Sequence, residues 1–331
     1  MRHKIPKSST AIIPNNTTVE LIYVSPVPLD THPAAIYLAS LQPGSRRSQK
    51  HALDVVARLL GANDCLTLNW GALRYQHTAA VRSAIIERYA PATANKILCA
   101  LRKTIKNAWR LGQIPSEEYY RAVDIEGVSN ITLPAGRELS AGEISALFQN
   151  CEDDPNSVIG ARDSAMIAIA YGCGARRAEI MSISIVDYNP ENNELIILHG
   201  KRNKPRIAHV VSGGDKLLRR WISIRGNEPG PLFCPVTKTG RIIIRSMTSQ
   251  AFYVMLQRRA AKANINDFTP HDLRRSFVSN LLEAGADIAT VAKMAGHSSI
   301  QTTVRYDRRP EETKRQAASL LHIPFRDKKK P

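Results

Sequence analysis

The sequence is poor in cysteine and has no long apolar run. Its five cysteines are odd in number, widely spaced and without a C-x-x-C pair, so neither a disulfide framework nor a zinc site is indicated. No segment approaches the length of a membrane span, and the basic N-terminal residues are not followed by the continuous apolar stretch of a signal peptide. We therefore expect a soluble, cytoplasmic chain that does not bind a membrane.

Acidic residues are also in short supply. The chain has 46 Lys and Arg against 29 Asp and Glu, which gives a formal charge of +17 over 331 residues. This excess is spread along the chain, and it favours a polyanionic partner because each neutralised phosphate releases counterions. A basic but inert surface is the alternative. Hydrophobic residues make up 43 % of the chain, enough for sizeable cores, and the length favours two domains.

Composition and periodicity divide the chain into segments. The pattern predicts a compact domain of four or five helices, in which Pro43 and Gly44 end a short first helix and Ser45 caps the next. An S-x-x-E capping box at Ser140–Glu143 opens a second domain. The expected bounds are a mobile lead-in at 1–32, the helical domain at 33–124, a linker at 125–137, the second domain at 138–325 and a basic tail at 326–331.

The second domain combines helices with a small amount of β-structure. Two strand-like runs, 194–199 and 206–211, flank a turn that contains Gly and Lys, which predicts a hairpin. The runs on either side of this hairpin are helical. The sequence therefore predicts a mostly α fold with a small β-sheet or hairpin in the second domain, an α+β class.

Two arginines occur where helices are expected to begin. His271 and Arg274 are three residues apart on a helix that starts at Pro270, so they share a face near its N-terminus, where an anion is favoured. An imidazole and a guanidinium are suited to gripping phosphate oxygens. Arg176 follows a Gly-x-Gly break, with Arg177 as its rival. Each pattern alone is more often structural than functional.

Three further residues can do chemistry. Lys201 lies on the hairpin turn, where lysines are usually only solvated; as a functional residue it would be a general acid for a departing alkoxide, with Lys204 as its rival. His297 follows Gly296 and could donate a hydrogen bond to a phosphate oxygen. Tyr306 comes nine residues later. Since an ordinary phenol has a pKa of about 10, it needs nearby cations and a base to act as a nucleophile.

These six residues are informative as a group. Cations can neutralise charge on a pentavalent phosphorus in the place that a metal ion takes in other enzymes. The sequence has no Walker A motif and no acidic metal cluster. We therefore expect phosphoryl transfer without a metal or another cofactor.

The motifs resemble those of the tyrosine recombinase, or phage integrase, family. They are G-A-R-R-A-E at 174–179, G-K-R-N-K at 200–204, H-x-x-R at 271–274, and G-H at 296–297 followed by Tyr306. Order and spacing agree with the family throughout. The resemblance covers residues 138–325, and the helical domain fits the family's core-binding domain more loosely, in a two-domain layout like that of the Xer recombinases.

The resemblance implies a site-specific recombinase that cuts and rejoins duplex DNA. Tyr306 would attack the scissile phosphate to form a 3′-phosphotyrosine, and Lys201 would protonate the leaving 5′-oxygen. His271 would assist as an acid or a base. The residues that would stabilise the transition state are Arg176, Arg274 and His297. Basic residues of the helical domain would contact the DNA backbone, and these are Arg46, Arg47, Lys50, Lys96, Arg102, Lys103 and Lys106.

The resemblance also implies an assembly on DNA. Four protomers would act on two sites, and the amphipathic segment 311–321, from Glu311 to Leu321, would dock on a neighbouring protomer. An accessory DNA-bending protein or a partner recombinase is a further expected partner. A resolvase or a type IB-like topoisomerase would use the same chemistry. A regulator that binds DNA with an inactive site is an alternative from another class.

Overall fold

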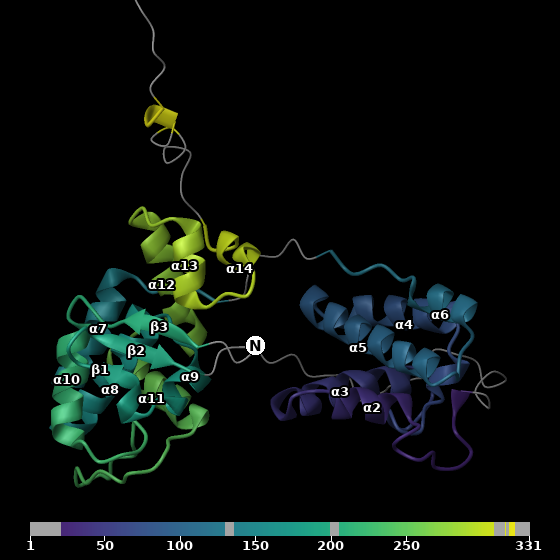
Figure 1. Ribbon diagram of the computed structural model, residues 1–331, viewed down its shortest axis with the longest axis horizontal. Coiled ribbons are helices and arrows are strands. Elements are labelled where there is room, and N and C mark those ends of the chain that lie inside the picture. The colour runs from purple at the N-terminus through teal and green to yellow at the C-terminus, as the bar shows by residue number, and fades with distance from the viewer. Residues whose placement is uncertain (1–20, 130–135, 199–204, 308–314, 316–317, 322–331) are drawn as a thin grey trace, which may run out of the picture. The chain divides into compact units, whose positions relative to one another are not determined.

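The computed structural model describes residues 21–129, 136–198, 205–307, 315 and 318–321 (Figure 1). The chain divides into two compact units, Met1–Leu133 and Pro134–Pro331. Both are mainly helical, and the second contains a three-stranded sheet of order β1-β2-β3, which confirms the predicted fold class. The finer domain bounds stay predictions. Within the described ranges, no helix is long and apolar enough to cross a membrane.

The first unit is a helical bundle built around one long helix. Helix α5 contacts each of the other four, and residues such as Leu98, Leu101 and Ile105 on its apolar face are fully buried. A short 3-10 helix places Trp70 in the same core. The helices are α2 (Pro33–Ala39), α3 (Pro43–Leu59), α4 (Tyr75–Arg88), α5 (Pro91–Arg110) and α6 (Ser116–Val123).

Helix α3 begins earlier than the sequence pattern suggested. Pro43 occupies its first turn and Gln42 precedes it as N-cap, so the prediction that Ser45 caps this helix was wrong. Proline suits this position because its fixed φ is already helical and its missing N–H would be unpaired there anyway. Helix α5 begins in the same way, at Pro91.

Both ends of the segment 21–32 are anchored in the first unit, whereas most of residues 24–31 are exposed; the sequence pattern had suggested a mobile lead-in over the whole N-terminal segment. Leu21 is buried in the core of the bundle. His32 caps α2 through Nδ1, and its Nε2 lies 3.0 Å from the carbonyl oxygen of Leu66. The sequence pattern missed this because these contacts are irregular and non-local. Residues 1–20 lie outside the described part of the chain.

The second unit is organised around a buried helix, α8, which contacts α7, α9, α10 and α12. Strands β2 and β3 pair antiparallel with Leu195 opposite Ala208, which confirms the predicted hairpin. The capping box of Ser140 and Glu143 is also present. The elements are α7 (Ala141–Glu152), α8 (Ser157–Gly172), α9 (Arg177–Ser182), β1 (Tyr188–Asn189), β2 (Glu194–Ile197), β3 (Arg206–His209), α10 (Gly214–Arg225), α11 (Ser249–Lys262), α12 (Pro270–Glu283), α13 (Ile288–Ala295) and α14 (Ile300–Val304).

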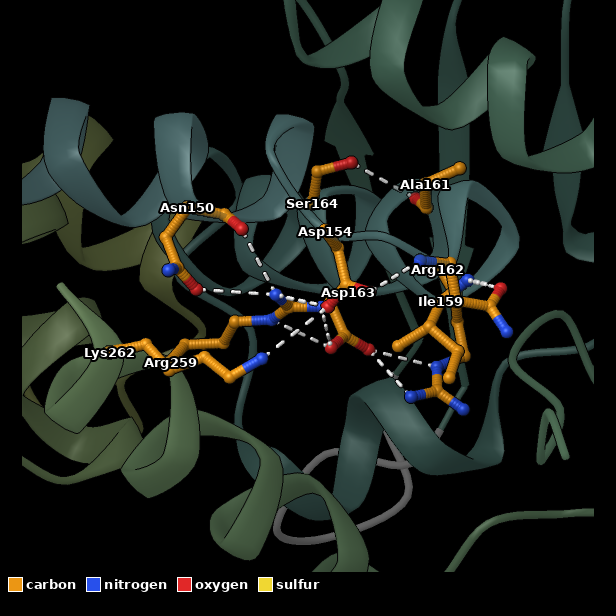
Figure 2. A network of polar contacts seen from close by, with 10 residues as sticks. Asn150, Asp154, Ile159, Ala161, Arg162, Asp163, Ser164, Arg259 and Lys262 are labelled. Atoms are coloured by element: carbon orange, nitrogen blue, oxygen red, sulfur yellow. Dashed lines mark hydrogen bonds and ion pairs between the residues drawn. The ribbon is translucent and has the colours of Figure 1, made fainter. Parts of the chain in front are cut away.

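An ionic network crosses the buried side of α8 (Figure 2). One carboxylate oxygen of Asp163 accepts hydrogen bonds from Arg162, and the other accepts two from Arg259, at 2.9 and 2.7 Å. Arg259 also pairs with Asp154 at 2.7 Å. A buried carboxylate is costly unless its oxygens are hydrogen-bonded, and both are bonded here. The network ties α8 to α11 and to the loop that precedes α8.

Candidate active site

The first turn of α12 is firmly held in place. Asp272 accepts hydrogen bonds from the backbone N–H and the hydroxyl of Thr269, both at 2.8 Å, which caps the helix. The other oxygen of Asp272 accepts from the backbone N–H of Arg137 at 3.0 Å. This turn carries His271 and Arg274. Both side chains therefore project from a helix end whose position is fixed by capping and by the preceding segment.

Arg274 is buried against the turn that follows α8. Its Nη1 donates to the carbonyl oxygen of Gly174 at 2.6 Å. Gly174 has a φ of +56°, and a Cβ there would lie 2.4 Å from Cδ1 of Phe277 on α12. Only glycine therefore lets this turn approach α12 closely enough for Arg274 to reach its carbonyl. The Gly-x-Gly break thus positions both arginine-bearing segments.

Arg176 is the N-cap of α9, and its partly exposed side chain reaches the end of α13. Its Nη1 pairs with Glu179 at 2.6 Å, and its Nη2 donates to the carbonyl oxygen of Gly296 at 2.8 Å. Arg177 is exposed. The geometry favours Arg176 over its rival, because Arg176 alone of the two contacts the Gly296–His297 turn.

Tyr306 follows α14 and lies between the two histidines. Its hydroxyl is 3.2 Å from Nε2 of His271. Its ring stacks on His297, with centroids 6.2 Å apart and planes inclined by 22°. The guanidinium of Arg275 lies over the same ring, 5.4 Å from its centroid. The side chain is 8 % exposed, so these contacts fix the ring while its hydroxyl faces an imidazole.

Both imidazoles are held neutral by their surroundings. Burial, followed by the nearby Arg274 and Arg176, lowers the pKa of His297 to about 4. Burial, followed by Arg274 and Arg275, also lowers the pKa of His271. Among the described residues, the positive charge of this site at neutral pH therefore comes from its arginines, and His271 can accept a proton.

Two arginine side chains of this site each have a buried nitrogen that makes no hydrogen bond to a described residue. Nη2 of Arg274 and Nη2 of Arg206 are buried and have no partner among the described residues. Buried donors without acceptors are costly, and a bound anion would satisfy them. Arg206 and Arg275 were not among the residues selected from the sequence. Arg275 directly follows the H-x-x-R motif, but no spacing signal marks Arg206.

The basic residues of the first unit have different surroundings. Arg46 donates to the carbonyl oxygen of Leu41 at 3.0 Å, and Lys50 pairs with Asp54 at 2.9 Å. Arg102 donates to the carbonyl oxygen of Ile125. These three side chains therefore have structural contacts in addition to any functional role.

The other four candidates are less constrained. Nζ of Lys96 lies 3.4 Å from the hydroxyl of Ser48, which brings the basic surface of α5 beside that of α3. Arg47, Lys103 and Lys106 are exposed. Lys201 and Lys204 lie outside the described residues, so the structure does not place the expected general acid. Among the residues that the structure covers, no three His, Cys, Asp or Glu side chains are grouped so that they could hold a metal ion.

The fold belongs to the class of two-domain integrases. The structure matches the Tn1549 transposon integrase in complex with transposon right end DNA, with a TM-score of 0.68 and 16 % identity over 88 % of this chain and 98 % of that one. It also matches a lambda integrase dimer bound to a core site, with a TM-score of 0.60 and 16 % identity over 84 % of this chain and 75 % of that one. At these identities the likeness concerns the fold.

The chain belongs to the phage integrase family, whose model matches residues 137–312. It is 31 % identical to tyrosine recombinase XerD of Rickettsia conorii over 54 % of this chain and 63 % of that protein. It is 30 % identical to XerC of Vibrio campbellii over 52 % of this chain and 54 % of that protein. The chain thus spans somewhat more than half the length of these relatives. Tyrosine recombinase slr0733 of Synechocystis is 26 % identical over 84 % of this chain and 90 % of that protein.

Proposed function

We propose that the chain is a site-specific tyrosine recombinase that acts in the cytoplasm and cuts and rejoins duplex DNA through a 3′-phosphotyrosine. The observation that carries this proposal is the position of Tyr306. Its hydroxyl lies 3.2 Å from Nε2 of His271, on a helix whose first turn also holds the buried Arg274. A phenol beside a neutral imidazole and buried guanidiniums is arranged to attack a phosphodiester.

In the proposed cleavage step, Oη of Tyr306 forms a bond to phosphorus while the bond to the 5′-oxygen breaks. The phenolic proton moves to Nε2 of His271, which is neutral at the start because of its lowered pKa. Lys201 supplies a proton to the 5′-oxygen, which leaves as a hydroxyl. A 5′-hydroxyl from a partner strand then attacks the phosphotyrosine and reverses each step, so no nucleotide cofactor is required.

The remaining site residues stabilise the negative charge that develops on the phosphate. Arg176 and Arg274 provide guanidinium donors for the non-bridging oxygens. Nδ1 of His297 lies 2.7 Å from the hydroxyl of Thr303. If Nδ1 accepts from that hydroxyl, Nε2 carries the proton and can donate to a phosphate oxygen. In this assignment, His297 acts as a neutral hydrogen-bond donor.

The first unit supplies contacts to the DNA backbone in this proposal. The exposed Arg47, Lys103 and Lys106 are available for phosphates, and Lys96 lies beside Ser48 on the same basic surface. Arg46, Lys50 and Arg102 are proposed as secondary contacts. Such contacts do not depend on the DNA sequence. Because they neutralise phosphates and release counterions, binding through them weakens steeply as salt is raised.

Covalent trapping tests the proposal. The full chain is mixed, without metal, with nicked duplexes drawn from the DNA that flanks its gene, and the products are run on a denaturing gel. We expect a protein–DNA band from the wild type and none from Tyr306→Phe, because phenylalanine has no nucleophilic oxygen. Tyr120→Phe is the matched control, since Tyr120 is 63 % exposed in the first unit; it should behave as the wild type.

Two results would contradict the assignment. A covalent band that persists in Tyr306→Phe would mean that another residue is the nucleophile. A wild-type chain that binds these duplexes in a salt-dependent manner but forms no covalent product with any of them would favour a DNA-binding regulator.

We also propose that four protomers assemble on two DNA sites and that the segment 311–321 docks on a neighbouring protomer. Within its described part, Leu320 and Leu321 are 85 % and 79 % exposed, so two adjacent apolar side chains lack cover in the single chain. Sedimentation of the trapped complex measures this assembly. Unchanged tetramers after deletion of residues 311–331 would argue against the docking role.

A further inference from the structure

We propose that Arg206 is a positioning residue of the active site, which holds Arg176 and the turn containing His297 in their working orientations. This inference rests on the proposed recombinase function. Arg206 opens β3, and its side chain is 11 % exposed. It is therefore a mostly buried cation on the hairpin.

The first contact of Arg206 is with the carboxylate that also orients Arg176. Oε2 of Glu179 accepts from Nη1 of Arg206 at 3.0 Å, and Oε1 pairs with Nη1 of Arg176 at 2.6 Å. Oε2 also accepts from the backbone N–H of Arg176 at 2.9 Å. Glu179 is 1 % exposed, so its carboxylate is shielded from bulk solvent. With both oxygens bound, the carboxylate cannot rotate, and Arg176 has one preferred orientation.

The second contact is with the end of α13. Nε of Arg206 donates to the carbonyl oxygen of Met294 at 3.0 Å. A cation that binds the last carbonyls of a helix stabilises its C-terminus. Arg206 therefore holds the point at which α13 ends and the turn to His297 begins.

Gly296 makes this arrangement possible. A Cβ at Gly296 would lie 3.2 to 3.4 Å from Cδ, Nη1 and Nε of Arg206, and its φ is +64°. The carbonyl oxygen of the same glycine accepts from Arg176. Arg206 and Arg176 thus contact the turn before His297 from two directions, joined by Glu179. Displacement of Arg206 would disturb Arg176 and His297 together.

Single-turnover cleavage of the duplex used for covalent trapping measures the effect. For Arg206→Gln we expect a cleavage rate reduced by about 10- to 100-fold, as expected when reacting groups are misplaced by a fraction of an ångström. Affinity for the DNA should stay within about twofold of the matched control Arg241→Gln, which removes an exposed charge from the same unit. Arg206→Lys should recover only part of the rate, because an ammonium cannot reach Glu179 and Met294 in the same fork geometry.

A double-mutant cycle separates positioning from direct phosphate contact. If Arg206 acts through Arg176, then Arg206→Gln should add little to the defect of Arg176→Lys, and the two effects should be far from additive. Fully additive losses, or an Arg206→Gln rate equal to that of Arg241→Gln, would overturn the proposal.

Hydrogen exchange gives a test that does not require DNA cleavage and that uses Arg206→Lys, which is milder than Arg206→Gln. In the full-length Arg206→Lys chain, the amides of residues 294–297 should exchange faster than in the wild type, while those of α8 should not change. Unchanged protection at 294–297 would overturn the proposal even if no duplex is cleaved by the wild type. Absence of any covalent product from both the wild type and Arg241→Gln would instead count against the proposed function.

Discussion

His297 is kept neutral by burial and by the arginines beside it, and this links the site to the pH dependence of folding. Its pKa is lowered from 6.5 to about 4 in the folded chain. The unfolded chain therefore binds more protons than the folded chain between these values, so the free energy of unfolding falls as the pH drops through this window. The pKa of His271 is shifted in the same direction.

We expect the urea midpoint of the second unit to fall between pH 7 and pH 5, and to fall less in His297→Gln than in the wild type. Urea titrations monitored by tryptophan fluorescence at both pH values measure this difference. His51→Gln is the control, because His51 is exposed on α3 in the first unit. An equal fall in His297→Gln and the wild type would mean that this imidazole is not the group responsible.

The catalytic candidates could be found from sequence because short spacing rules apply to them. His271 and Arg274 share a helix face by periodicity, and Gly174 and Gly296 mark the turns before Arg176 and His297. Arg206 could not be found in this way. Its partners, Glu179 and Met294, are 27 and 88 residues away, and only the folded chain brings them together.

At the scale of secondary-structure elements, the junction between α8 and α9 shows why particular residues are required. Helix starts with capping boxes could be predicted from sequence, as at Ser140, since their signal is local. The start of α3 at Pro43 was missed because a Pro-Gly pair fits both the end of one helix and the beginning of another. The close approach of Gly174 to Phe277 depends on tertiary packing, so it could not be predicted.

Gly174→Ala should destabilise the second unit by about 2 kcal/mol or more, from the strain at positive φ and the overlap with Phe277. Gly172→Ala is a close control, because a Cβ at Gly172 meets no atom within 4 Å. It should be neutral or stabilise by up to about 1 kcal/mol. Urea midpoints of both variants measure the difference. Equal urea midpoints for the two variants would show that the turn at Gly174 accommodates a Cβ without loss of stability.

At the scale of the whole molecule, the first unit has its own buried cluster and the second unit has two, so each unit should respond to its own substitutions. The Asp163 network lies entirely within the second unit and joins helices that are distant in sequence (Figure 2). Its disruption therefore tests whether the two units unfold independently.

Asp163→Asn should lower the stability of the second unit by about 3 kcal/mol or more, because Arg162 and Arg259 would then be buried beside a neutral amide. The transition of the first unit should not move. Glu152→Gln is the control: Glu152 and Arg220 form an exposed pair, 42 % and 44 % accessible, which should contribute less than about 1 kcal/mol. Urea unfolding followed by fluorescence and by limited proteolysis separates the two transitions. A joint shift of both would show that the units unfold cooperatively.

The carboxylate of Glu179 is shared by two arginines. Arg176 and Arg206 both pair with this buried acid, and Arg274 lies close enough to interact electrostatically with all three, so three arginines share one carboxylate at the candidate site. Selection for thermal stability alone would favour the loss of one of these arginines, whereas the proposed recombinase chemistry requires them. Inorganic phosphate or sulfate that fits among them should therefore protect the protein against heat. The ionic composition of a storage buffer thus becomes a determinant of how long the protein survives.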